Sequence, residues 1–218
     1  NEDFVRGINR QAPIAMLFAS RCNTKNIKPI QDKVWAGKGS QPVFLYRKGF
    51  ASTADTYLGV KGGSPKNSHA HMDGGSFIYE WGGVRWAVDL GSQDYHSLES
   101  KGIGLWKKGQ NSQRWQVYRL SNHSHNTLTI NNKIHQYKGM ATMTKVLNKK
   151  KYKGAEFDLS SLFSDTESVT RRITVDDNDK VCCVDKIASG STDCSVRWNM
   201  TTFAKAEIID DHTILLKQ

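Results

Sequence analysis

The 218-residue sequence contains only four cysteines and no long hydrophobic run. The cysteines Cys22, Cys182, Cys183 and Cys194 show no C-x-x-C spacing, which argues against a zinc site built from thiolates. The apolar stretch QAPIAMLFASRC near the N-terminus is too short to span a bilayer. Internal repeats and low-complexity segments are also missing. These absences favour an ordinary globular protein without a membrane span.

Acidic residues are fewer than basic ones. The chain has 31 Lys and Arg against 21 Asp and Glu, which gives a formal net charge of +10 and a pI near 9.4. Such a surface attracts polyanions, so nucleic acid, anionic membranes and acidic polysaccharides are all candidate partners. No nucleic-acid-binding motif accompanies the charge, and we therefore expect no nucleic-acid partner. A merely soluble basic surface also stays open as an explanation.

Short runs of β-forming residues dominate the sequence from about residue 41 onward. Examples are QPVFLYRKGF, SFIYEW, VRWAVDL and SVTRRITV, separated by Gly, Asn, Asp and Ser. This pattern predicts a mainly β fold, an antiparallel β-sandwich, over residues 39–218. Residues 1–38 are expected to form a helical segment and a linker, since Ala, Met and Leu follow Pro13.

The clearest local prediction is a hairpin from Ser76 to Asp89 that turns at Gly82 and Gly83. A two-residue turn there places Trp81 opposite Val84, Glu80 opposite Arg85, Tyr79 opposite Trp86 and Ser76 opposite Asp89. Opposite charges and paired aromatic rings support this register. The hairpin returns Asp89 to the end of the sheet that follows the segment NSHAHMDGG.

A second hairpin is predicted in NTLTINNKIHQY, with its turn at Asn131 and Asn132, because Asn tolerates a positive φ. It follows the segment NHSHN. On a strand, His123 and His125 share one face, as His69 and His71 do in the first segment.

Histidines from two strands and an Asp from a hairpin form a donor set that suits zinc or a similar divalent ion. The residues available are His71, Asp89 and His125, with His69, Asp73 and His123 as neighbours. Strict alternation back from Ser76 puts His71 on the wrong face for Asp89, so a bulge at Gly74 and Gly75 is expected to reset the face. Hydrogen-bonded strand ends without an ion are the alternative.

Three segments in this order, NSHAHMDGGSF, WAVDLGSQDY and SNHSHNTLTIN, resemble the heparinase II/III-like polysaccharide lyases. The likeness covers about residues 40–218, is most specific between 66 and 132, and is nearest to heparan-sulfate lyases. It implies a lyase-type β-sandwich that follows an α/α toroid, of which the N-terminal helical segment would be the remnant. The chain therefore looks like the C-terminal part of a longer enzyme.

The resemblance also implies roles for particular residues. His69 matches the family's catalytic-site histidine, and Tyr95 lies where family members often have an aromatic hydroxyl. His71, Asp89 and His125 match a structural metal set, usually described as zinc. The implied reaction is β-elimination at a uronic acid of heparan sulfate or a related glycosaminoglycan, which leaves an unsaturated uronate end. Family members act in the bacterial periplasm or outside the cell, and the parent's toroid domain would be this domain's partner.

Several alternatives stay open. The catalytic Tyr of the family lies on the toroid, so one alternative is that this chain alone is a non-catalytic, acidic-glycan-binding module. Another is a lyase for alginate or another polyuronate, since such enzymes share the motifs. His96, His135 and His212 lie outside the motifs and are expected at the surface or in turns. Trp106 and Trp115 are expected mainly in the core, with stacking on a sugar ring as the other interpretation.

Overall fold

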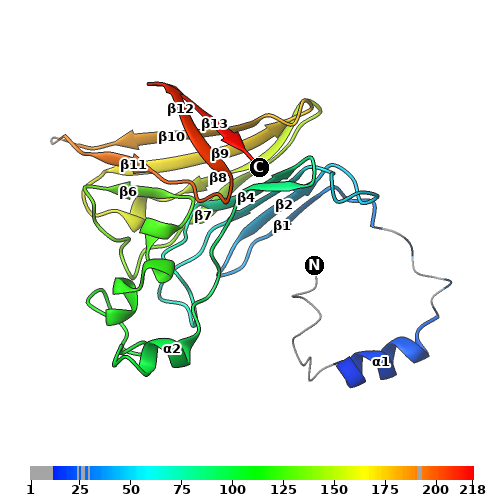
Figure 1. Cartoon of the computed structure of the whole chain (residues 1–218), viewed down its shortest axis with the longest axis horizontal. Helices are drawn as coiled ribbons and strands as arrows, with labels where there is room; N and C mark the ends of the chain where they lie inside the picture. The colour runs from blue at the N-terminus through cyan, green and yellow to red at the C-terminus, as the bar shows by residue number, and fades with distance from the viewer. Residues whose placement is uncertain (1–11, 24, 26–27, 29, 191–192) are drawn as a thin grey trace. The chain divides into compact units, whose positions relative to one another are not determined.

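The computed structural model describes residues 12–23, 25, 28, 30–190 and 193–218 (Figure 1). Contacts divide the chain into a unit that ends at Asp32 and a second unit from Lys33 to Gln218. The first unit contains helix α1 (Ala12–Arg21), which buries none of its side chains. In the described part of the chain, no helix has the length and apolar character needed to cross a membrane.

The second unit is built around two large antiparallel sheets. The first sheet has five strands in the order β1-β2-β3-β4-β5, and its strands are β1 (Val34–Gly37), β2 (Val43–Arg47), β3 (Tyr57–Lys61), β4 (Ser76–Trp81) and β5 (Val84–Ala87). The second has four strands in the order β10-β9-β8-β7, and they are β7 (Thr142–Asn148), β8 (Tyr152–Asp158), β9 (Ser168–Asp176) and β10 (Val181–Ala188). The first sheet begins at Val34, ahead of the boundary expected after residue 38.

One hydrophobic core joins these sheets. Phe44, Leu58 and Phe77 from the five-stranded sheet belong to the same buried cluster as Phe157 and Ile173 from the four-stranded sheet. Alternation explains why each sheet supplies this cluster: β2 buries every second residue, and β9 does the same over nine residues. The predicted antiparallel sandwich is confirmed.

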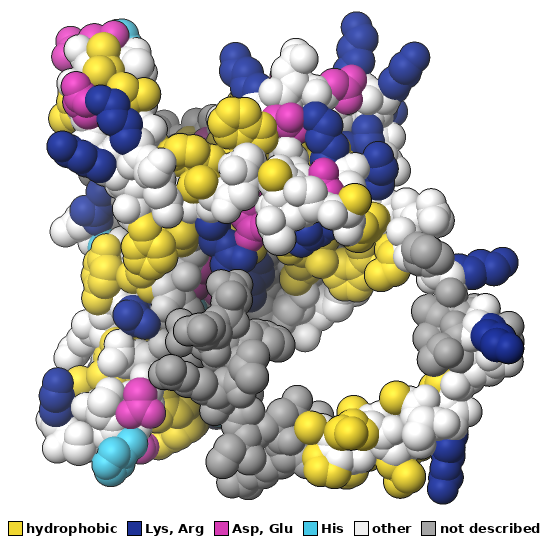
Figure 2. Space-filling view, turned by 45° about the vertical axis from the view of Figure 1, so that its right-hand side comes forward, with side chains coloured by type: hydrophobic (Ala, Val, Ile, Leu, Met, Phe, Trp, Pro, Cys, Tyr) yellow, Lys and Arg dark blue, Asp and Glu magenta, His cyan; other side chains and the backbone are white. Residues whose placement is uncertain are grey.

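Shorter elements complete the unit. Two further strand pairs occur, β6 (Leu128–Ile130) with β11 (Val196–Trp198) and β12 (Lys205–Asp210) with β13 (Thr213–Lys217). Helix α2 (Tyr95–Glu99) and the 3-10 turns η3 (Gln113–Gln116), η4 (Tyr118–Leu120) and η5 (Asn122–Ser124) lie between β5 and β6, and η6 (Ser160–Leu162) follows β8. On the face seen in Figure 2, Lys and Arg side chains are spread over several parts of the surface, in agreement with the net charge of +10.

The first predicted hairpin forms, with one change of register. Trp81 pairs with Val84 and Glu80 with Arg85, and both turn glycines have positive φ, 62° at Gly82 and 83° at Gly83. A bulge then places Tyr79 opposite Ala87 instead of Trp86. The predicted pairing of Tyr79 with Trp86 is therefore wrong, because the Trp86 indole turns back and donates to the Trp81 carbonyl at 3.1 Å.

The second predicted hairpin is wrong. Asn131 and Asn132 do adopt positive φ, but β6 pairs with β11, which lies far along the chain, and not with the residues after the turn. Asn131 Oδ1 accepts from the Ser195 N–H at 2.9 Å, and the Asn131 N–H donates to the Ser195 carbonyl at 2.9 Å. These bonds stabilise the long-range pairing over the local one.

Candidate active site and metal centre

The β3–β4 loop, residues 62–75, carries the two histidines of the first motif. It is not an extended strand: His69 has φ of 57° and Gly75 has φ of 78°, and Gly74 and Gly75 form a turn directly before β4. The expected bulge within a strand is therefore absent. His69 and His71 do not share a face, because the left-handed backbone at His69 leaves its side chain exposed while His71 is half-buried.

The His-Asn-Thr segment fixes the ends of the hairpin. Asn126 donates from its side chain to the carbonyls of Phe77 at 2.6 Å and Val88 at 2.9 Å, and Thr127 donates to the Gly74 carbonyl at 2.7 Å. Both side chains are fully buried. Since Val88 precedes Asp89, these bonds hold Asp89 beside His125.

His71, Asp73 and His125 converge on one point. One ligand atom of each residue lies within 4.8 Å of the others, and the two imidazole rings have centroids 5.3 Å apart. Asp89 has a different place: the His125 Nδ1–H donates to its Oδ2 atom at 2.7 Å. The expected histidines thus meet, and Asp73 is the carboxylate whose oxygen lies within 4.8 Å of a ligand atom of each.

The second ring nitrogen of His125 is the most informative atom of this cluster. His125 is fully buried, and its Nε2 atom has no hydrogen-bond partner among the described residues. A buried polar atom without a partner costs free energy, so something absent from the protein chain is expected to bind it. Burial and the neighbouring His125 lower the pKa of His71 to about 4, which keeps that imidazole neutral and able to act as a ligand.

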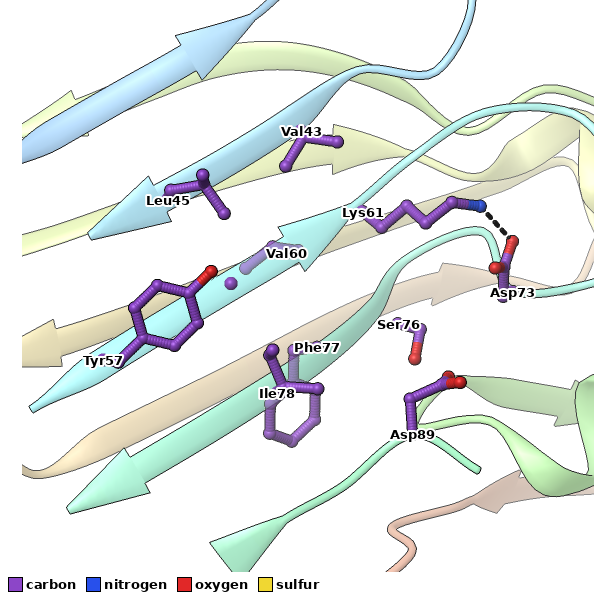
Figure 3. A pocket seen from close by; sticks show the side chains of 11 residues that line it. Val43, Leu45, Tyr57, Val60, Lys61, Asp73, Ser76, Phe77, Ile78 and Asp89 are labelled. Carbon is purple, nitrogen blue, oxygen red and sulfur yellow. Dashed lines mark hydrogen bonds and ion pairs between the residues drawn. The ribbon is translucent and has the colours of Figure 1, made fainter. Parts of the chain in front are cut away.

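The carboxylate oxygens of Asp89 and Asp73 have different bonding partners. Burial alone would raise the pKa of Asp89, but the hydrogen bond from His125 and that from the Gly91 N–H lower it to about 2. These bonds occupy both Asp89 oxygens. Asp73 pairs through Oδ1 with Lys61 at 2.5 Å, so its Oδ2 atom stays available. Figure 3 shows Lys61, Asp73 and Asp89 at one end of a cavity of about 250 Å³, which is otherwise mainly apolar.

A second cluster lies around His69. Its Nδ1 atom is hydrogen-bonded to the Tyr95 hydroxyl at 3.1 Å, and the two rings are nearly parallel with centroids 5.9 Å apart. Trp106 packs edge-on against both rings, at 5.8 Å from His69 and 5.3 Å from Tyr95. The first residue of α2 and a loop residue thus form one aromatic group with the first histidine of the motif.

Arg114 connects this group to the rest of the site. Its Nη2 and Nε atoms donate to the Ala70 carbonyl at 3.0 and 3.3 Å, and the guanidinium carbon lies 5.6 Å from the centre of the Tyr95 ring. Ala70 separates His69 from His71. The buried guanidinium therefore holds the peptide that points the two histidines into different sites.

The His69 cluster opens into a cavity of about 150 Å³. Cationic and aromatic side chains line it, namely Lys66, Lys107, Lys108, Arg114, His69, Trp106, Trp115 and Tyr137. Cations suit carboxylate or sulfate groups, and exposed aromatic faces suit the apolar faces of sugar rings. The chemistry of the cavity fits an anionic carbohydrate.

Residues 45–218 match the family model described as heparinase II/III-like, C-terminal. The chain belongs to this heparinase II/III-like family. No curated protein matches the chain in sequence. The family assignment agrees with the resemblance seen in the three motif segments.

Solved structures share the fold of this heparinase II/III-like chain. The heparan sulfate lyase HepC from Pedobacter heparinus is 17% identical with a TM-score of 0.64, and the match covers 91% of this chain and 30% of that one. A heparinase III, the BT4657 gene product with methylated lysines, is 18% identical with a TM-score of 0.66, covering 92% and 30%. The chain thus spans about a third of the length of these enzymes.

Several residues lie in places that the sequence did not indicate. Asp73 belongs to the cluster of His71 and His125, although the sequence indicated it only as their neighbour. Arg114 binds the peptide between His69 and His71, and no feature of the sequence indicated this role. His123 lies apart from the cluster of His71, Asp73 and His125, because η5 turns the chain there and Arg197 donates to the His123 Nδ1 atom at 2.9 Å. His135 is fully buried, not at the surface, and its Nε2–H donates to the Leu128 carbonyl at 3.0 Å. Trp115 is buried as expected, whereas Trp106 is exposed.

Proposed function

We propose that this chain is the sandwich part of a polysaccharide lyase that cleaves heparan sulfate or a related uronic-acid glycosaminoglycan by β-elimination. The observation that carries the proposal is the hydrogen-bonded pair of His69 and Tyr95, 3.1 Å apart, at a cavity lined by cations and aromatic rings. The titles of the structural relatives, heparan sulfate lyase and heparinase III, support the choice of substrate.

The proposed reaction removes the C5 proton, breaks the C4–O bond and protonates the leaving oxygen. A base removes the proton from C5 of the uronate, and the C5–H electron pair forms the double bond between C4 and C5. The bond from C4 to the glycosidic oxygen breaks, and that oxygen takes up a proton. The step needs a neutralised carboxylate, a base and an acid.

The residues around the cavity suit these tasks. Arg114 and Lys66 are placed to neutralise the uronate carboxylate, which makes the C5 proton more acidic. His69 and Tyr95 share a hydrogen bond, so a proton can pass between the Tyr95 hydroxyl and the His69 imidazole near the reacting sugar. Arg114 Nη2 lies 3.5 Å from the Tyr95 oxygen and stabilises negative charge that develops there.

We also assign a divalent metal ion, most consistent with zinc, to His71, His125 and Asp73. The residues fit such an ion, because Nε2 of His125 is buried without a partner in the described part of the chain, and two imidazoles plus one carboxylate form a common zinc donor set. Asp89 orients His125 through Nδ1, as carboxylates do behind metal-bound histidines. The ion would fix the β3–β4 loop and the His-Asn-Thr segment beside the cavity.

The parent protein is proposed to supply the rest of the enzyme. This chain spans about a third of its structural relatives, so a preceding toroid domain is its expected partner and a source of further catalytic groups. By the same family relationship, we place the protein in the periplasm or outside the cell. Alone, the chain is expected to bind the glycan even where elimination needs the longer parent.

The proposal is tested with heparan sulfate and two proteins, this chain and its longer parent. Elimination is followed by the ultraviolet absorbance of the unsaturated uronate, and binding by calorimetry. We expect elimination by the parent, and a loss of at least about 100-fold in kcat for His69→Ala and Tyr95→Phe, the range typical for acid–base groups.

Matched variants control for nonspecific effects. His212→Ala removes an exposed histidine and Tyr152→Phe removes a hydroxyl at the start of β8, and neither residue lines the cavity. Both are expected to keep normal activity. If the parent releases no unsaturated product from any uronate polymer, the lyase proposal is wrong and a glycan-binding module remains.

A further inference from the structure

The cavity at His69 continues into a second cavity. Lys108 and Tyr137 line both of them. The second cavity has a volume of about 470 Å³, against about 150 Å³ for the first. A ligand held at His69 therefore has room to extend past Tyr137, in a space large enough for a small-molecule site.

Side-chain hydrogen bonds hold the segments that line the second cavity. Gln110 accepts from the Tyr137 N–H at 2.6 Å and donates to the His135 carbonyl at 2.9 Å, so it connects two segments of the chain. The Trp115 indole donates to the Gly109 carbonyl at 2.9 Å. These bonds fix the loop that carries Lys108, and a fixed loop loses little entropy when a ligand binds.

Lys108 and Lys138 line the second cavity, and Lys107 lines the first beside Lys108. Lys107, Lys108 and Lys138 are all exposed. None of the three takes part in any of the ion pairs formed by the described residues. Three unpaired ammonium groups along the two neighbouring cavities repel one another, and an anionic ligand relieves that repulsion.

Lysines line both cavities, and the first cavity also contains an arginine. Arg114, with its planar guanidinium, lies in the first cavity, and such a group pairs best with planar carboxylates. The second cavity offers lysines, which act as point charges and suit a tetrahedral oxyanion. The uronate carboxylate thus belongs at His69, and a sulfate group belongs beside the lysines.

We propose that Lys107, Lys108 and Lys138 form a sulfate-recognising subsite for the sugar units that flank the unit held at His69. The inference rests on the proposed function and adds to it a substrate class, sulfated oligosaccharides longer than a disaccharide. The lysines select for sulfation, while His69 and Tyr95 act on the uronate.

The test measures binding of defined heparan sulfate hexasaccharides to this chain by calorimetry. One variant carries Lys107→Gln, Lys108→Gln and Lys138→Gln. Its control carries Lys149→Gln, Lys150→Gln and Lys151→Gln, which remove the same charge from the β7–β8 turn at the far end of the sandwich from α2 (Figure 1). We expect affinity to fall about 10-fold or more in the first variant and less than about 3-fold in the control.

Desulfated hexasaccharide provides the second arm. The unmodified chain should bind it about 10-fold more weakly than the sulfated one, and the first triple variant should bind both alike. Equal losses in the two triple variants, or equal binding of both sugars, overturn the subsite. Duplex DNA that binds as tightly with the same dependence on the three lysines overturns its assignment to sugars.

The outcomes separate this inference from the lyase proposal. Lysine-dependent binding of sulfated sugar by this chain, together with a parent that performs no elimination, supports the subsite and rejects the lyase. Elimination that depends on His69 but not on the three lysines or on sulfation supports the lyase and rejects the subsite.

Discussion

The Nδ1 atom of His125 lies 2.7 Å from the Oδ2 atom of Asp89. This bond directs the other nitrogen of a fully buried imidazole toward His71 and Asp73, where no described group satisfies it. We propose different tasks for the aspartates of two motif segments: Asp89 orients His125, and Asp73 would bind the ion. The arrangement predicts a difference between the two in metal retention.

Zinc content is expected to depend on Asp73 more than on Asp89. We expect about one ion per chain in the purified protein, none in His71→Ala and almost none in Asp73→Asn, because a ligand is lost. Asp89→Asn keeps both histidines and should weaken binding about 10- to 100-fold, as changes behind a ligand do. Elemental analysis after dialysis against a graded chelator measures the difference.

Asp211→Asn, in the exposed β12–β13 turn, is the matched control and should retain the metal. The reverse order, with full loss in Asp89→Asn and retention in Asp73→Asn, would identify Asp89 as the ligand, as the spacing of the sequence suggested. If neither the unmodified chain nor any variant contains metal, the proposed metal site is wrong.

A buried arginine supports both ligand-bearing segments. Arg171 is fully buried, makes two bonds to Asp185, at 2.7 and 2.9 Å, and donates to the carbonyls of Gly75 and Asn126. Asp185→Ala leaves this charge without its partner and should lower the free energy of unfolding by about 3–5 kcal/mol. Chemical denaturation measures the change.

The next residue along the strand supplies the control. Arg172 pairs with Glu156 at 2.8 Å on the exposed side of the sheet. Glu156→Ala should cost less than about 1 kcal/mol, because water solvates an exposed guanidinium. Similar losses in the two variants would mean that Arg171 gains no special stabilisation from burial.

The pH dependence of stability should report on His135. Burial lowers its pKa from 6.5 to about 3, against the raising effect of the bond to Leu128, with His125, Arg171 and His123 as further lowering charges. Between these pH values His135 binds a proton in the unfolded chain but stays neutral in the folded chain. Stability is therefore expected to fall as pH decreases from about 6.5 toward 3.

His135→Gln keeps a donor for the Leu128 carbonyl and removes the titration. Urea denaturation at pH 7 and pH 5 should show a smaller difference between the two pH values in this variant than in the unmodified chain. His212→Gln, at an exposed site, should leave the difference unchanged. An unchanged difference in His135→Gln would show that other groups dominate, His71 among them.

The sequence predicts those parts of the fold that local patterns determine. Alternation and turn residues are sufficient for the sandwich and for the Gly82–Gly83 turn, since both depend on neighbouring residues. The pairing of Tyr79 depends on a bulge, and that of β6 depends on β11, more than 60 residues away. Contacts of this kind leave no periodic signal in one sequence.

The same distinction applies to the site. The motif segments identified His71 and His125, which the structure brings together, and Asp89, which it places behind His125. The resemblance pointed separately to His69 and Tyr95, which share a hydrogen bond in the structure. Arg114 and Arg171 gave no signal, because their roles come from carbonyls that other segments present to them. A count of charged residues in the sequence does not distinguish buried arginines from exposed ones.

The exposure of Trp106 leads to the final prediction. Its indole is 59% exposed, although it packs against His69 and Tyr95 and donates to Glu99 at 2.6 Å. An exposed ring that is held in place offers a flat face to a sugar at little entropic cost. Trp106→Ala should therefore weaken heparan sulfate binding by about 3- to 10-fold, while Trp106→Phe should recover part of the loss.

Trp81 is the matched control for this measurement. It is 49% exposed and lies at the Gly82–Gly83 turn, away from both cavities at His69. Trp81→Ala should leave the calorimetric affinity for heparan sulfate unchanged. Equal affinities in Trp106→Ala and Trp81→Ala would mean that Trp106 only packs against His69 and Tyr95. The sugar would then be held by charge alone, and its affinity should fall steeply with added salt.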